Sequence, residues 1–146
     1  MKKIASILMA FVMCAMVSSC GSTGNLAASD TAAKTAGISC AQALTALNSN
    51  YKANGTISLS NTADLSNMLI VATSYSQLRQ NKGNSSYKQS FTNGMISGSN
   101  LITAVNATSI VNTLLNCTGL NNVNASNIQQ KAETVGTIIT LLNALK

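Results

Sequence analysis

The chain has 146 residues, enough for one domain with a hydrophobic core. Charged residues make up 8% of it, against a usual level of about 25%, and the formal net charge is +6. Because the basic residues are scattered and only one of them is Arg, the composition does not support a nucleic-acid interface.

The first residues have the pattern of a secretory signal. Residues 1–3 carry two lysines, and residues 4–17 form an apolar run without a charge. This run is too short to span a bilayer, which needs about 20 apolar residues. We therefore predict a signal peptide over residues 1–19.

The end of that segment, Val17-Ser18-Ser19-Cys20, resembles the lipobox of bacterial lipoproteins, in which an aliphatic residue and two small residues precede a cysteine. The resemblance implies cleavage before Cys20 and attachment of a diacylglycerol to its thiol. Two or three acyl chains, such as palmitate, would hold the mature protein on a membrane. The alternative is an ordinary signal peptide with an incidental cysteine.

The residues around the cleavage point also bear on location and charge. Gly21 and Ser22 follow Cys20, where an aspartate would favour retention at the inner membrane, so we expect the outer membrane, on its periplasmic or its surface face. Loss of Lys2 and Lys3 with the leader lowers the formal charge from +6 to +4.

Residues 20–38 are rich in Gly, Ala, Ser and Thr and lack a periodic apolar face, which predicts a lipidated, flexible tether. Within it, Asp30-Thr31-Ala32 resembles the Asp-Ser/Thr-aliphatic sequon for O-glycosylation in Bacteroidetes. That resemblance makes Thr31 a candidate glycosylation site.

The rest of the chain, residues 39–146, reads as helices. Three Ser-x-x-Gln capping motifs and Ser99 mark helix starts, and glycines mark the ends. We predict an all-α fold, an antiparallel bundle of four to five helices, with residues 101–115 as its central helix because apolar side chains nearly surround them. Residues 56–60 alternate like a strand but are expected to form an extended loop. The expected helices cover about 40–51, 61–82, 86–96, 99–119 and 126–145.

Two cysteines outside the leader and the lipobox, Cys40 and Cys117, form a candidate disulfide pair in an oxidising compartment. If the helices alternate up and down, these residues fall at the same end of the bundle. The alternative is two buried, unbonded thiols. Without His or nearby acids, no metal site is expected.

Candidate catalytic groups are few, because the chain has no His and only three acids. Two Ser-x-x-Lys strings, Ser49 to Lys52 and Ser85 to Lys88, resemble the nucleophile motif of penicillin-recognising enzymes. Their companion Ser-Asp-Asn and Lys-Thr-Gly strings are missing. We therefore expect no enzyme and no cofactor.

Taken together, these features predict a non-enzymatic envelope lipoprotein, a structural or interaction module that meets another envelope protein or a glycan. The first alternative is a carrier with an apolar ligand cavity between helices, since aliphatic residues far outnumber aromatic ones. A Ser/Lys hydrolase is the third interpretation.

Overall fold

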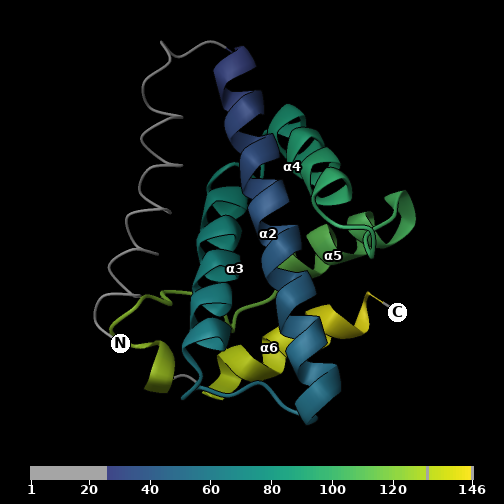
Figure 1. Cartoon of the computed structure of the whole chain (residues 1–146). Helices are drawn as coiled ribbons and strands as arrows, with labels where there is room; N and C mark the ends of the chain where they lie inside the picture. The colour runs from purple at the N-terminus through teal and green to yellow at the C-terminus, as the bar shows by residue number, and fades with distance from the viewer. Residues whose placement is uncertain (1–25, 131, 146) are drawn as a thin grey trace.

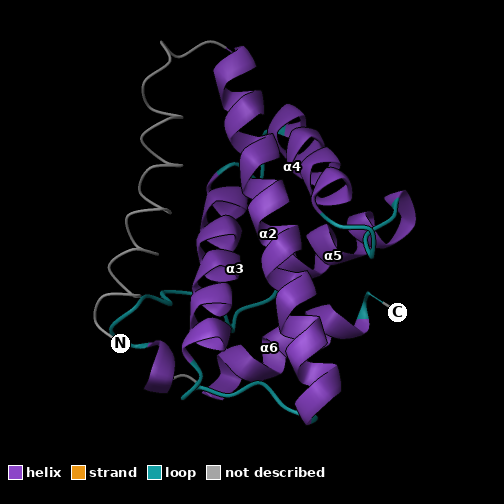
Figure 2. Ribbon diagram, viewed as in Figure 1, coloured by secondary structure: helices purple, strands orange, loops and turns teal. Residues whose placement is uncertain are grey.

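A computed structural model describes residues 26–130 and 132–145, and these fold into a bundle of helices without a strand (Figures 1 and 2). The predicted all-α class is confirmed. The predicted signal peptide and the lipobox with Cys20 lie outside the described residues. The helices are α2 (Leu26–Asn54), α3 (Thr62–Gln80), α4 (Ser85–Gly98), α5 (Ala104–Asn116), the 3₁₀ turn η1 (Ile128–Gln130) and α6 (Ala132–Asn143).

Helices α2, α3 and α4 form the body of the bundle. They run in alternating directions, so that α3 is antiparallel to both neighbours and α2 is parallel to α4, while α5 and α6 lie across them (Figure 1). Helix α2 contacts α3, α4 and α6 and is the central element. Among the described residues, no helix combines the length and apolar character needed to cross a bilayer.

The prediction of a central helix over residues 101–115 is wrong. Helix α5 begins at Ala104 and buries a single stripe that includes Ile110 and Leu114. Val105, on another side of the helix, is 84% exposed. The helix is therefore amphipathic, with its buried stripe on one side and Val105 exposed to solvent.

The prediction of a flexible tether is also wrong for residues 26–38, because these residues form the first part of α2. Ala33, Ala36 and Gly37 are buried there, at the spacing that continues to Cys40. Small side chains can form a buried helix face when the neighbouring helix comes close enough. Since α2 starts earlier than expected, Ser39 lies inside a helix and caps nothing.

The close approach occurs between α2 and α4. A Cβ atom added at Gly94 would lie 2.1 Å from the carbonyl oxygen of Lys34, and one added at Gly37 would lie 2.1 Å from the carbonyl oxygen of Phe91. The two backbones are thus in direct contact. Gly94 and Gly98 lie within α4 and let it pack against α2.

Asparagine and threonine side chains cap the next helices in place of the predicted serines. Asn84 accepts a hydrogen bond from the backbone of Tyr87 at the start of α4. Thr103 and Asn106 form a reciprocal capping box on α5. Ser99 is the C-cap of α4 rather than an N-cap.

The loop between α2 and α3 is held by Asp64, which is 2% exposed in the first turn of α3. Its carboxylate accepts hydrogen bonds from Asn50 Nδ2 at 2.7 Å and from the backbone N–H of Ser58 at 2.9 Å. Ile57 is buried under this loop. Residues 56–60 are therefore a fixed loop, as the sequence predicted.

Candidate functional site

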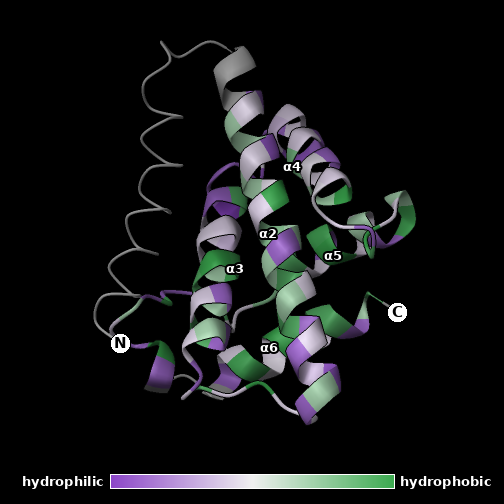
Figure 3. Cartoon of the chain, in the orientation of Figure 1, coloured by the Kyte–Doolittle hydropathy of each residue, from purple (hydrophilic) through white to green (hydrophobic). Residues whose placement is uncertain are grey.

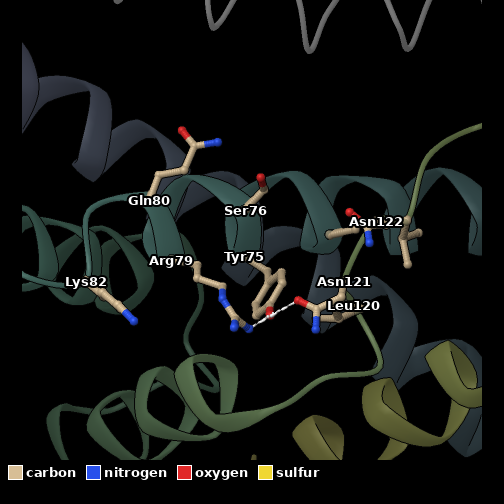
Figure 4. Close-up of a pocket in the computed structure, with 10 residues that line it drawn as sticks. Tyr75, Ser76, Arg79, Gln80, Lys82, Leu120, Asn121 and Asn122 are labelled. Carbon is tan, nitrogen blue, oxygen red and sulfur yellow. Dashed lines mark hydrogen bonds between the residues drawn. The ribbon is translucent and has the colours of Figure 1, made fainter.

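A pocket of about 430 Å³ lies between the C-terminal half of α3 and the segment after α5 (Figure 4). Tyr75 and Arg79 form one wall, and Leu120 and Asn121 form the other. Lys82, in the turn after α3, lies at the rim. The pocket thus combines a guanidinium, an ammonium, a phenol and an amide.

Arg79, Tyr75 and Asn121 are joined by hydrogen bonds at the centre of this pocket (Figure 4). Arg79 Nη1 donates to the hydroxyl oxygen of Tyr75 and to Asn121 Oδ1, the second at 3.1 Å. The Tyr75 hydroxyl lies 2.5 Å from Asn121 Oδ1 and 3.2 Å from the carbonyl oxygen of Cys117, and its single proton serves one of them at a time. We call these three residues the Tyr75–Arg79–Asn121 cluster.

The cluster depends on helical spacing. Residues four apart lie on one face of a helix, so Tyr75 and Arg79 project together from α3. The guanidinium carbon lies 5.8 Å from the centroid of the Tyr75 ring, within the range of a cation–π interaction. Tyr75 is 2% exposed, whereas Arg79 is exposed. The buried Tyr75 ring therefore packs against a guanidinium group that solvent and ligands can reach.

The opposite wall is held by its own hydrogen bonds. Asn122 has a φ of +56°, a left-handed conformation that Asn adopts more readily than most residues. Its carbonyl oxygen accepts from Asn127 Nδ2 at 2.7 Å, and the backbone N–H of Asn121 donates to Thr118 at 3.1 Å. Thr134 of α6 also donates to the carbonyl oxygen of Gly119, at 2.9 Å. The Asn121 amide is therefore set in place before any ligand arrives.

This arrangement suits binding of a negatively charged or hydroxyl-rich group. A guanidinium has five N–H donors in a planar fork that matches carboxylates and phosphates, and Lys82 adds a second positive charge. Ser76 and Gln80 also border the pocket but point away from the cluster (Figure 4). Tyr75 and Arg79 lie within the helix expected over about 61–82, but the sequence did not predict Tyr75, Arg79 or Asn121 as site residues.

The two predicted disulfide partners are free thiols. Cys40 lies near the middle of α2 and contacts Ser74 of α3. Cys117 contacts Tyr75, the next residue of α3, whose side chain projects about 100° away from that of Ser74 around the helix axis. The predicted disulfide is therefore absent here, because Cys40 is not at a helix start. Burial raises the pKa of Cys40 to about 12, against a hydrogen bond to Ser74 that lowers it. Burial also raises the pKa of the half-buried Cys117.

The other residues singled out from the sequence lie away from the pocket. Thr31 is exposed on α2, where its carbonyl oxygen accepts a hydrogen bond from Thr35. Ser49 and Lys52 are exposed near the end of α2, and the Ser85 to Lys88 string forms the first turn of α4. Within the described residues, no group of three or more His, Cys, Asp or Glu side chains could hold a metal ion.

Comparisons of the chain with protein-family models, with curated proteins and with solved structures find no match. The function must therefore be argued from the residues of this chain. Two features carry that argument, namely the lipobox-like sequence at Cys20 and the Tyr75–Arg79–Asn121 cluster.

Proposed function

We propose that the mature chain is a lipoprotein of the bacterial cell envelope, held on the outer membrane by lipid attached to Cys20. The order of basic start, apolar run, two small residues and cysteine supports this proposal. The anchor would keep the helical body at a membrane surface, because two or more acyl chains bind a bilayer firmly.

The body acts, in this proposal, as a non-enzymatic interaction module for an envelope glycan or protein. The Tyr75–Arg79–Asn121 cluster is the observation that carries it, because a preset guanidinium and amide favour carboxylates and hydroxyl groups. An acidic polysaccharide supplies both kinds of group. A carrier of apolar ligands gains no support from this pocket, since two charges and several amides line it.

The anchor is tested with Cys20→Ser in the native host. The wild-type protein should incorporate labelled palmitate and sediment with outer membranes, whereas the variant should do neither. A matched control is Cys14→Ser, which changes a cysteine inside the predicted leader and should leave both readouts unchanged. Equal labelling of the Cys20→Ser variant and the wild type would contradict the proposal.

The binding role is tested on an array of acidic and neutral bacterial polysaccharide fragments. Arg79→Gln should weaken binding of acidic fragments by at least about tenfold, because it removes a charge-assisted hydrogen bond. Lys52→Gln removes an exposed positive charge outside the pocket and should change binding little. If both variants lose the same affinity, nonspecific attraction explains the binding and the pocket does not.

A further inference from the structure

Three lysines from two separate parts of the sequence lie at one end of the bundle, the end where α2 begins. Lys34 is in the first part of α2, Lys82 is in the turn between α3 and α4, and Lys88 is in the first part of α4. We call this group the N-terminal-end lysines. Figure 1 shows the end of α3 and the start of α4 beside the upper part of α2.

Contacts between the helices confirm this placement. Ser86, in the first turn of α4, donates a hydrogen bond to Asp30 of α2 at 2.8 Å. Ser74 of α3 donates to the carbonyl oxygen of Ala36 at 3.4 Å, and the chain then runs on past that level to Lys82. The folded topology therefore brings together charges that are scattered along the sequence.

The charge at this end is positive. Arg79 and the N-terminal-end lysines carry four positive charges against one negative charge, that of Asp30. Elsewhere among the described residues, the charged side chains are one basic residue, Lys52, and two acidic residues, Asp64 and Glu133. Lys34 and Lys82 are exposed, and Lys88 is partly buried with a stem long enough to bring its ammonium group to the surface.

The proposed anchor holds this same end nearest to the membrane. Only residues 21–25 separate Cys20 from Leu26 at the start of α2, and a segment of that length reaches at most about 20 Å. Lys34 lies about 12 Å further along the helix, at 1.5 Å per residue. A segment this short allows the charged end to approach the bilayer surface, whose potential falls off within about 8 Å at physiological salt.

We infer that the N-terminal-end lysines bind the phosphates of anionic phospholipids in the membrane that carries the protein. This inference rests on the proposed lipid anchor at Cys20. The contact would fix how the bundle stands on the membrane, with the N-terminal part of α2 against the headgroups and Lys52 at the other end of that helix. Each lysine near an anionic surface should add roughly a fivefold factor to the interaction.

The test uses the lipidated mature protein, purified and reconstituted into vesicles. One set contains phosphatidylcholine with phosphatidylglycerol, and the other contains phosphatidylcholine alone, so that no lipid amine competes for the reagent. A membrane-impermeant amine reagent is applied, and labelling of each lysine is followed by peptide mass spectrometry. The N-terminal-end lysines should label at least fivefold more slowly in the anionic vesicles, while Lys52 labels equally in both. In about 1 M NaCl, where the screening length is roughly 3 Å, the difference should vanish.

The possible failures are distinguishable. Equal labelling of all lysines in both vesicles, on a protein whose mass shows lipid at Cys20, would overturn the inference alone. Absence of lipid at Cys20 would overturn the proposed anchor and the inference with it. If a soluble acidic polysaccharide protects the same lysines and anionic vesicles do not, the basic end serves a glycan instead. A variant with Lys34, Lys82 and Lys88 all changed to Gln should lose the salt-sensitive protection of the neighbouring end of the bundle, measured by hydrogen exchange at residues 28–36, whereas Lys52→Gln should retain it.

Discussion

The contact between α2 and α4 and the contact between α5 and α6 bury surface in opposite ways. In the first, Gly37 and Gly94 leave so little room that each would place a Cβ 2.1 Å from a carbonyl oxygen of the other helix. In α5 and α6 the buried residues are instead large and branched, such as Ile110 and Leu141. Figure 3 shows the same difference, with α5 more strongly hydrophobic than α4.

The difference shows how a chain with 3% aromatic residues forms a core. Where large side chains are scarce, dispersion contacts come from backbone atoms brought together over glycine and alanine. Where aliphatic side chains are available, these side chains interdigitate and provide the dispersion contacts themselves. An added methyl group should therefore have opposite effects in the two regions.

The largest expected effect is on the α2–α4 contact. Gly94→Ala should lower the free energy of unfolding by about 3 kcal/mol, because the new Cβ meets the backbone of Lys34, which cannot move aside without shifting a helix. Urea denaturation measures this change. Ser97→Ala, on an exposed position of the same helix, is the control and should be nearly neutral. A loss below about 1 kcal/mol for Gly94→Ala would show that the helices are not in backbone contact.

A smaller effect is expected from the thiol of Cys40, which is buried in α2 and contacts Ser74 of α3. Burial raises the pKa of Cys40 from 9.0 to about 12, so between these values the unfolded chain loses a proton that the folded chain keeps. The stabilising contribution of the buried thiol is then fully present below pH 9 and falls as the pH rises, by about 1.4 kcal/mol per pH unit. Urea unfolding from pH 8 to about 11 should show a steeper fall for the wild type than for Cys40→Ala, which keeps only the contribution of the other groups whose pKa burial raises, such as Cys117. Parallel curves for the two proteins would contradict the burial of Cys40.

The smallest effect is expected in α6. Gly136 is exposed within that helix, and an added Cβ would meet nothing within 4 Å. Gly136→Ala should raise the free energy of unfolding by about 0.5–1 kcal/mol, because alanine loses less backbone entropy in a helix. Thermal and urea denaturation both report it. Any destabilisation here would mean that the second region is as tightly packed as the first.

The sequence predicted those parts of the fold that depend on large apolar side chains, whereas the serines predicted to cap α2, α4 and α5 do not cap them. Helix α3 lies within the range expected from the sequence, about 61–82, with Asn61 as its N-cap and Asp64 in its first turn. The start of α2 could not be predicted in this way, because its buried residues, such as Ala33 and Ala36, are small. They form no stripe of large apolar side chains in the sequence, and they are buried only when the helices have packed together. A search for large apolar residues therefore does not detect a buried helix face made of alanine and glycine.

The candidate site was half visible in the sequence. Tyr75 and Arg79 stand at helical spacing, which places them on one face of α3. Asn121 was indistinguishable from its neighbours in an asparagine-rich loop, because its role depends on a left-handed turn at Asn122 and on contacts with α6 through Gly119. Patterns within a few residues of sequence do not predict contacts between residues that are far apart in the chain.

The glycine contact also has a consequence for how this protein can evolve. Every amino-acid replacement of glycine adds a Cβ, so at Gly37 and Gly94 even a replacement by alanine pushes α2 away from α4. Leucines elsewhere in the core can be exchanged for other aliphatic residues of similar volume at modest cost. Among descendants of this gene, we therefore expect these two glycine codons to change only to synonymous ones, while the aliphatic core drifts.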